Sequence, residues 1–326
     1  MKNERLPYSS VLVTGASGYI GSQVIAALAH DPRGVKTIIA ADIRPPAPEV
    51  QRADVVYETA DVRSANFAEL FRRHSVELVV HLAAIVTPGK GSDREVEYQI
   101  DVLGTQNVVA GCLGAGVRKI IYTSSGAAYG YHSDNRPWLT EDDPLRGNEE
   151  FAYSHHKRLI EEMLARTRRE HPELLQLVLR PGTILGKNTR NQITDLFDGR
   201  WVLGLSGSST PFVLIWDADV VGAILRGIHE GGAGIFNMAG DGTLSLREMA
   251  KIMRKPYVAI PPGAIAAALS VLKRLGLSQY GPEQVDFLRY RPVLANDRLK
   301  KEFGYVPRKT TREVFELFLE GRRGGS

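Results

Sequence analysis

Short apolar runs alternate with longer segments of helical apolar spacing over residues 11–180, and this rhythm limits the possible fold more than any other feature. The runs cover residues 11–13, 37–41, 55–59, 78–82, 120–123 and 176–180. Residues 78–80 and 120–121 are continuously apolar, which is typical of parallel strands buried on both faces. The sequence therefore predicts repeated βαβ units and an α/β fold with a doubly wound parallel sheet.

The rhythm changes after Pro181, where a Gly- and Ser-rich stretch at 204–209 and scattered prolines follow. Residues 218–229 have helical spacing, and residues 234–238 resemble a strand that returns to the sheet. We predict that residues 1–182 and about 213–239 form the domain that contains the sheet. Residues 183–212 and about 240–320 would then form a smaller, discontinuous C-terminal lobe.

The composition of the 326-residue chain excludes several classes of protein. Apolar residues make up 43% and charged residues 24%, which are values of a globular rather than a disordered chain. The net charge of +4 is scattered, so nucleic-acid binding is not indicated. Residues 1–8 lack a secretory signal, and the longest apolar stretch, residues 263–272, is too short for a membrane span. We expect a cytoplasmic protein without an integral membrane span.

Cysteine and histidine usage gives no sign of a metal centre. The one cysteine, Cys112, can form neither an internal disulfide nor a site with several thiolates. The eight histidines show no ligand spacing, since His155 and His156 are adjacent and face different ways on a helix. We therefore expect no metal.

A glycine-rich turn joins the first predicted strand to the first predicted helix at residues 14–21. Gly15 allows a tight turn, Gly18 lets a pyrophosphate approach the backbone, and Gly21 lets the helix pack closely on the strand. A plain strand-to-helix turn is the alternative, but the spacing and context favour a Rossmann dinucleotide site. The candidate cofactor-binding residues of this turn are Gly15, Ser17, Gly18, Tyr19, Ile20 and Gly21.

An acidic residue, Asp42, follows the second predicted strand about 20 residues beyond the turn. A carboxylate at this position accepts hydrogen bonds from the adenosine ribose and repels a 2′-phosphate, which favours NAD over NADP. Arg44 is close enough to accommodate a 2′-phosphate, and Asp42 can also be read as a solvated turn residue. We include both residues in the cofactor site.

Tyr153 and Lys157 lie one turn apart on a helix that the sequence starts at 148–150. A lysine cation beside a phenol favours the phenolate, which would let Tyr153 exchange protons near neutral pH. Ser124 and Ser125 follow the strand at 120–123, and doubly wound folds bind their ligands at the carboxyl ends of strands. The alternative for the two serines is backbone capping.

Seven stretches together resemble an extended short-chain dehydrogenase/reductase of the NAD-dependent epimerase/dehydratase family. They are residues 14–21, 61–62, 81–84, 123–125, 153–157, 180–182 and 296–307. The resemblance covers nearly the whole chain and implies an NAD-dependent enzyme that works without a metal. It also implies a homodimer formed through the helix after Asp101 and the helix of Tyr153.

The same resemblance assigns roles to individual residues. Ser125 would be the catalytic hydroxyl, Tyr153 would move the substrate hydroxyl proton, and Lys157 would hold the ribose and tune Tyr153. The remaining cofactor contacts that it implies are Asp61 and Val62 at the adenine, Leu82, Ala83 and Ala84 along the dinucleotide, and Ser124 and Pro181 on the nicotinamide side.

The chain departs from the family pattern at several positions. Asp101 stands where the family commonly has asparagine, so it is either a site residue or a helix acid paired with a nearby base. No acidic pair follows Thr123, which disfavours dehydration. The stretch 207–212 lacks the arginine that clamps the diphosphate in sugar-nucleotide epimerases, although Arg289 or Arg291 can supply a cation.

These features lead to one predicted function and two alternatives. The chain is predicted to be an NAD-dependent oxidoreductase acting on a secondary alcohol or ketone. Because 264–277 is apolar and the clamp arginine is missing, the predicted substrate is a small, non-nucleotide, lipophilic molecule. The first alternative is a sugar-nucleotide 4-epimerase, an isomerase with tightly bound NAD. The second is a non-catalytic NAD-binding regulatory protein, suggested by Asp101.

Overall fold

The computed structural model describes residues 8–86, 93–209, 211–275, 281 and 284–323. A seven-stranded sheet lies at its centre, in the order β11-β6-β5-β4-β1-β2-β3. Every neighbouring pair in this sheet is parallel, which confirms the predicted doubly wound α/β fold. The strands are β1 (Ser10–Thr14), β2 (Thr37–Asp42), β3 (Val56–Thr59), β4 (Leu78–His81), β5 (Lys119–Thr123), β6 (Leu175–Pro181) and β11 (Gly234–Met238).

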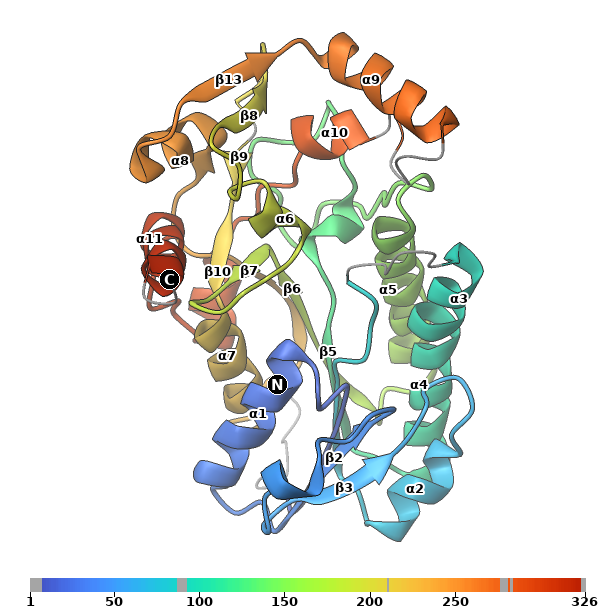
Figure 1. Ribbon diagram of the computed structural model, residues 1–326. Helices are drawn as coiled ribbons and strands as arrows, with labels where there is room; N and C mark the ends of the chain where they lie inside the picture. The colour runs from blue at the N-terminus through green and yellow to red at the C-terminus, as the bar shows by residue number, and fades with distance from the viewer. Residues whose placement is uncertain (1–7, 87–92, 210, 276–280, 282–283, 324–326) are drawn as a thin grey trace.

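Helices cover both faces of this sheet (Figure 1). Helices α1 (Tyr19–His30) and α7 (Asp217–His229) lie on one face. The other face is covered by α2 (Phe67–Arg73), α3 (Arg94–Tyr98), α4 (Gly104–Ala115) and α5 (Ala152–Glu170). Alternate residues of each strand serve the two cores: Val11 and Val13 pack toward α1, and Leu12 packs toward α2. This double burial explains the continuous apolar runs in the sequence.

Short irregular helices occur in the segments that connect these elements. They are the 3₁₀ turns η1 (Pro48–Val50) and η3 (Gly126–Tyr129) and the π-helical turns η2 (Gln99–Leu103) and η4 (Leu299–Phe303). Helix α5 begins at Ala152, later than the predicted 148–150, because Asn148 lies outside it and accepts a hydrogen bond from the Tyr131 amide (2.7 Å).

The strand order reverses between β1 and β4, since the chain leaves β1 toward β2 on one side and crosses back to β4 on the other. Loops that leave the carboxyl ends of strands at such a point diverge and leave a crevice. The glycine turn after β1 and residues 82–84 after β4 are therefore neighbours, and the Leu82 amide donates to the Thr14 carbonyl (3.2 Å).

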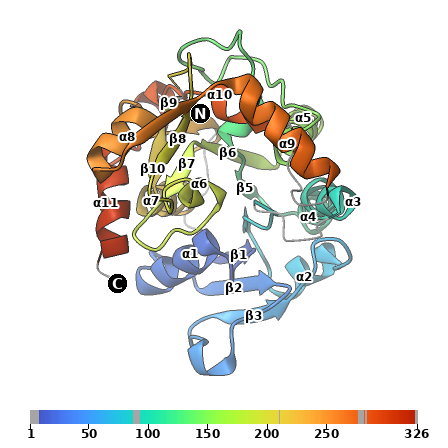
Figure 2. The same cartoon turned by 45° about the horizontal axis from the view of Figure 1, so that its top comes forward.

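The remaining residues form small sheets and helices beyond the carboxyl ends of the strands (Figure 2). The strand pairs are β7 (Thr183–Leu185) with β10 (Leu214–Trp216), β9 (Pro211–Phe212) with β12 (Leu244–Ser245), and β8 (Val202–Leu205) with β13 (Tyr257–Ile260). The helices are α6 (Gln192–Asp195), α8 (Leu246–Met253), α9 (Pro262–Arg274), α10 (Gln284–Arg289) and α11 (Thr311–Arg323).

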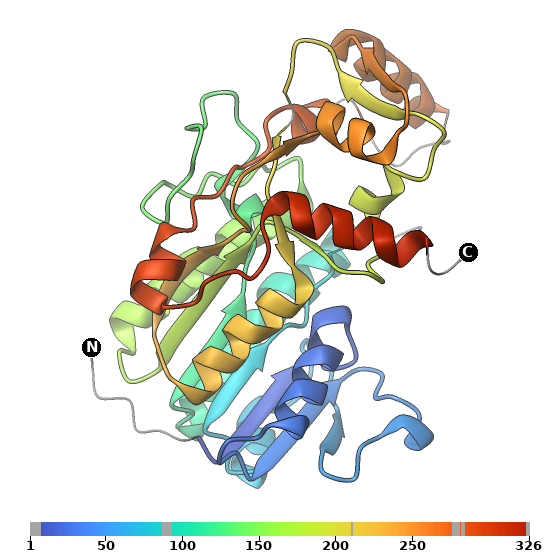
Figure 3. The same ribbon diagram turned by 90° about the vertical axis from the view of Figure 1, so that its left-hand side faces the viewer.

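This second region has a core of its own, built around Phe197, Phe212, Phe315 and Phe318. Figure 3 shows α11 running along its side toward the carboxyl terminus. The exact limits of the two lobes remain a prediction. Among the described residues, no helix combines the length and apolar character that crossing a bilayer requires.

Candidate active site

The glycine turn after β1 is packed so tightly that side chains cannot enter it. Gly15 has a positive φ of +66°, and a Cβ atom there would lie 2.7 Å from the Ala83 nitrogen. A Cβ atom at Gly21 would lie 2.1 Å from the Gly15 carbonyl oxygen. Gly18 precedes α1 and places no side chain over the amides of its first turn. The turn thus has the form of a dinucleotide cradle, which any Cβ atom would fill.

Three residues predicted to bind the cofactor form one hydrogen-bonded group. The Asp42 carboxylate, at the end of β2, accepts from the amides of Ser17 (3.0 Å) and Arg44 (3.1 Å). The Ser17 hydroxyl donates to the Arg44 carbonyl (2.7 Å). Asp42 is therefore held beside the glycine turn.

Tyr19 has a structural contact that sequence reasoning missed. Its hydroxyl donates to Asp217 in the first turn of α7 (2.5 Å) and lies 2.8 Å from the Thr189 hydroxyl. Burial and the bond to Asp217 raise the pKa of Tyr19 to about 12. The side chain thus joins the glycine turn to the segment after β7, and nothing local in the sequence indicates this bridge.

The predicted adenine residues lie at the end of β3. Asp61 pairs with Arg63 at 2.6 Å, and this hydrogen bond lowers the pKa of the carboxyl group. Val62 is buried, and its Cγ2 atom lies against Gly104, where a Cβ atom would approach to 2.6 Å. Asn107 holds the segment by donating to the Val62 carbonyl (2.9 Å).

Ser125 and Tyr153 meet at the carboxyl end of β5. Ser125 is the N-cap of η3, where its hydroxyl accepts from the Ala127 amide (3.1 Å), so the capping alternative also holds. Burial raises the pKa of Tyr153 above its ordinary value, while a hydrogen bond to the Ser125 side chain opposes that shift. The two predicted catalytic side chains therefore lie close to each other at the end of β5.

Lys157 lies one turn further along α5 and is buried. Its ammonium group donates to the Tyr122 hydroxyl (2.9 Å) and the Thr123 carbonyl (3.0 Å). The Lys157 nitrogen is 5.6 Å from the centre of the Tyr153 ring. Burial lowers the pKa of Lys157 to about 8. The expected lowering of the Tyr153 pKa by this lysine is not seen, because the ammonium group is turned to the end of β5 and burial dominates the Tyr153 pKa.

Asp101 is paired with a base, as one of its two sequence interpretations proposed. One of its carboxylate oxygens accepts from the Ile85 amide (2.8 Å), and the other lies 3.1 Å from the His156 ring. Both side chains are 2% exposed. Ile85 follows the Leu82–Ala84 segment, and His156 precedes Lys157 on α5. Asp101 therefore links the loop after β4 to the catalytic helix.

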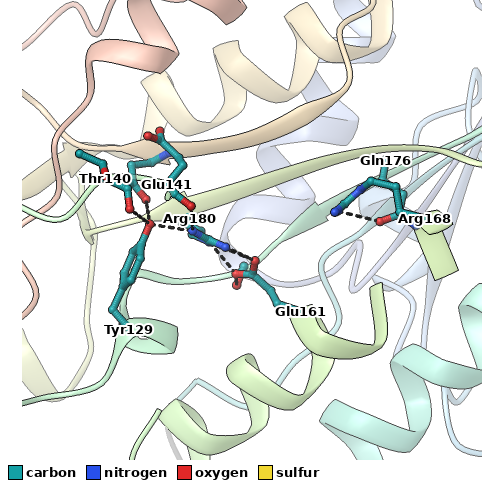
Figure 4. A network of polar contacts seen from close by, with 9 residues as sticks. Tyr129, Thr140, Glu141, Glu161, Arg168, Gln176 and Arg180 are labelled. Carbon is teal, nitrogen blue, oxygen red and sulfur yellow. Dashed lines mark hydrogen bonds and ion pairs between the residues drawn. The ribbon is translucent and has the colours of Figure 1, made fainter. Parts of the chain in front are cut away.

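Ser124, at the end of β5, is part of a buried polar network. Its hydroxyl donates to Glu161 on α5 (2.5 Å), and Arg180 of β6 makes a two-point ion pair with the same carboxylate (2.7 Å). The Arg180 guanidinium also donates to the Tyr129 hydroxyl (2.7 Å), as Figure 4 shows. Pro181, the last residue of β6, is buried beside this network. Sequence reasoning missed Glu161, although its spacing from Tyr153 and Lys157 places it on their face of α5.

Arg291 lies over aromatic rings in the second lobe. Its guanidinium carbon is 4.2 Å from the centre of the Phe212 ring and 4.9 Å from that of Phe287. One terminal nitrogen, Nη2, donates to the Thr183 hydroxyl (3.1 Å). The other, Nη1, is buried and has no hydrogen-bond partner within the described part of the chain. Burial lowers the pKa of this side chain.

The surroundings of Arg291 are both aromatic and cationic. Tyr131, Phe151 and Phe287 form a cluster with ring centres 4.7–5.6 Å apart. An adjoining cavity of about 330 Å³ is lined by residues that include Arg136, Arg289 and Arg291. No carboxylate is among the described residues that line it. This region can therefore receive a molecule with a planar or apolar part and an anionic group.

The comparisons with known proteins agree with this architecture. Residues 11–200 match the model of the NAD dependent epimerase/dehydratase family. A protein of Mycobacterium tuberculosis whose function is uncharacterized is 28% identical over 317 residues, covering 96% of this chain and 84% of that protein. A UDP-glucose 4-epimerase of Klebsiella pneumoniae is 33% identical over 129 residues, covering 37% of this chain and 91% of that protein.

Solved structures show the same fold. The UDP-glucose 4-epimerase of Thermotoga maritima has a TM-score of 0.75 at 20% identity, with 97% of this chain and 99% of that one covered. The UDP-glucose 4-epimerase of Thermus thermophilus, in complex with NAD, has a TM-score of 0.74 at 22% identity, with 97% and 100% covered. With more than half of its length matched by the family model, this chain belongs to the NAD-dependent epimerase/dehydratase family, and NAD is its cofactor.

Proposed function

We propose that this protein interconverts the epimers of a sugar nucleotide by reversible hydride transfer at a secondary alcohol carbon. The observation that carries this proposal is Arg291, whose Nη1 atom is buried without a partner while the guanidinium lies over Phe212. The sequence lacked a cation in 207–212, and Arg291 brings one to that strand from 79 positions further along the chain. This cation therefore favours a sugar nucleotide over the small lipophilic alcohol or ketone as the substrate.

An unpartnered buried guanidinium is costly, and an anion that enters the site would satisfy it. Arginine binds phosphate through two parallel hydrogen bonds, and its flat face stacks on aromatic rings. The diphosphate of a sugar nucleotide meets both conditions, since Nη1 is free to donate and Phe212 fixes the plane of the group. The similar epimerase structures, one of them solved with UDP-glucose, support the same class of substrate.

The catalytic residues would divide the chemistry as follows. NAD, when bound along the glycine turn, supplies the hydride acceptor and donor. Tyr153 takes the proton from the substrate hydroxyl and returns it, and the Ser125 hydroxyl, which lies near Tyr153, orients the same oxygen. Lys157 places a positive charge near the Tyr153 ring below a pH of about 8. Burial sets the pKa of Tyr153 in the free protein, and the nearby charge would stabilise the negative charge that develops on the phenol oxygen during proton transfer.

Incubation with UDP-glucose and UDP-galactose tests the proposal. We expect each to be converted to the other without accumulation of NADH, and we expect mass spectrometry to find NAD retained by the purified protein. A cofactor recycled within each turnover has no need to leave. If the protein instead produces NADH from a free alcohol and ignores sugar nucleotides, the proposed substrate class is wrong.

A second candidate function keeps the smaller, lipophilic alcohol of the sequence prediction. The aromatic cluster of Tyr131, Phe151 and Phe287 favours it, because an apolar substrate would be well covered there. The same incubation with lipophilic alcohols in place of sugar nucleotides distinguishes the two. A non-catalytic role loses its main support, because the interactions of Asp101 with His156 and Ile85 account for that residue.

A further inference from the structure

Helix α9 turns an apolar side to solvent, which is the reverse of the usual orientation. Its partly covered residues, such as Ile265 and Leu269, lie on the other side, and α9 has no fully buried residue. The exposed positions include an apolar series with helical spacing, made of Ala264, Ala267, Ala268, Val271, Leu272 and, just past the helix, Leu275. Lys273 and Arg274 are exposed at the carboxyl end of the helix. Val271 is 56% and Leu275 65% exposed. No α9 residue lines the cavity beside Arg291.

A second apolar surface lies at the same end of the molecule. Strands β8 and β13 pair in parallel, and their register places Leu203 beside Val258. Both side chains are exposed, and neighbouring Trp201 is 60% exposed. Figures 1 and 2 show α9, β13 and β8 at the end of the molecule opposite β3 and α2. We call the exposed residues of α9 and these two strands the end face.

The charges around the end face are mainly positive. From residue 249 to residue 282 the sequence contains five lysines and arginines and no aspartate or glutamate. Residues 199–216, which include β8, contain Arg200 and no acidic residue. Asp198, three residues before Trp201, is ion-paired with Arg322, and Asp286 of α10 lines a different cavity together with Arg146 and Arg158. The end face is therefore apolar with a cationic surrounding.

We propose that the end face binds the surface of an anionic membrane, with α9 lying in the plane of the headgroups. A helix with exposed apolar residues beside lysines and arginines is the form that interfacial helices take, since the apolar side enters the acyl boundary and the cations meet anionic lipids. A second copy of the chain fits less well, because a two-fold contact would bring the two cationic surroundings together. This inference is independent of the substrate proposed above.

Vesicle flotation with the full chain tests the proposal. Vesicles of phosphatidylcholine alone are compared with vesicles that also contain phosphatidylglycerol, at low and at high salt. We expect partitioning onto the anionic vesicles to be at least about tenfold stronger, and we expect salt to weaken it. If the protein binds neither vesicle, or binds both equally at low salt, the proposal is wrong.

One variant and its matched control test whether the end face is the surface that binds the vesicles. V271E/L275E puts carboxylates into the apolar side of α9 and should lower partitioning at least about tenfold. The matched control is V50E in η1 of the other lobe, where Val50 is 68% exposed, and it should bind vesicles like the parent protein. Equal binding by V271E/L275E and the parent protein would overturn the proposal.

A third variant covers the case in which V271E/L275E unfolds. R200E/R274E leaves the apolar residues in place and reverses two charges, so binding to anionic vesicles should fall while thermal unfolding stays unchanged. Unaltered binding by this variant would also overturn the proposal. Sedimentation of the parent protein and V271E/L275E without lipid provides the last check, since a dimer that this variant dissociates would identify the end face as a subunit interface instead.

Discussion

Two arginines, Arg180 and Arg291, lie in enclosed parts of the molecule and have opposite surroundings. Arg180 is 4% exposed and meets the Glu161 carboxylate at two points, and that partner raises its pKa despite burial. Arg291 has no carboxylate partner among the described residues, rests on Phe212, and has its pKa lowered by burial. The fold thus gives the Arg180 guanidinium hydrogen-bond and charge partners, whereas it leaves the hydrogen bonds of the Arg291 guanidinium incomplete.

This difference in partners indicates that Arg180 stabilises the fold and that Arg291 is suited to bind a ligand. A buried guanidinium with a complete set of partners holds elements together, here α5, β6 and η3, and gains nothing from a ligand. A guanidinium whose hydrogen bonds are incomplete reduces the stability of the free protein and returns that cost when an anion binds. The predictions below test whether each region behaves as its partners indicate.

The largest expected effect separates two tyrosines, Tyr153 of the candidate active site and Tyr129 beside Arg180. Tyr153→Phe removes the proton-transfer group and should lower kcat by about 10³-fold, with NAD affinity nearly unchanged. The matched control is Tyr129→Phe, which removes the hydroxyl next to Arg180 and should cost stability of about 1–2 kcal/mol while turnover persists. Steady-state kinetics and NAD titration measure both, and turnover that survives in Y153F would contradict the assigned role.

The next effect concerns the satisfied region. Glu161→Gln leaves Arg180 buried without a charge partner, so the free energy of unfolding should fall by about 3 kcal/mol. Urea denaturation measures the change. Glu162→Gln is the control, because Glu162 is 54% exposed and its pair with Arg158 should contribute little. If the two variants are equally stable, the Glu161–Arg180 pair does not hold the region together.

Replacing Arg291 should act in the opposite direction on stability. Arg291→Met keeps most of the contact with Phe212 and removes the unsatisfied charge, so stability should stay the same or rise by about 1 kcal/mol. Affinity for a sugar nucleotide should fall by about 10–100-fold, the value of hydrogen bonds to a charged group. Calorimetry with UDP-glucose measures the affinity, and a loss of stability without loss of affinity would place Arg291 with the structural arginine.

The smallest effect is on the pH dependence of turnover. Lys157 keeps its ammonium group below a pH of about 8, and the Asp101 carboxylate raises its pKa against burial. Asp101→Asn removes that support, so the Lys157 pKa should fall and the basic limb of kcat/KM should move to lower pH. The amide oxygen can still accept from Ile85, which preserves the loop. A basic limb that does not move would show that Lys157 does not limit activity at high pH.

The sequence predicted those parts of the molecule that depend on local spacing. Apolar runs located the strands, glycine spacing located the turn at 14–21, and the one-turn separation of Tyr153 and Lys157 placed them on one face of α5. The Glu161–Arg180 pair and the position of Arg291 over Phe212 could not be predicted, because they depend on how distant strands and loops pack. The orientation of α9 was also missed, since periodicity shows that a helix has two sides but not which one faces the core.

The return of the chain to the sheet has a consequence for the order of events during synthesis. Strand β11 pairs with β6 only after residues 183–233 have been made, and its Asn237 amide and side chain contact Glu141 and Tyr129. On the ribosome, the first six strands therefore emerge while this edge of the sheet is open and the interactions around Tyr129 are incomplete. Strand β11, the last strand of the sheet to be translated, closes this edge and completes the interactions around Tyr129. The sheet domain can therefore finish folding only after residue 238 has left the exit tunnel.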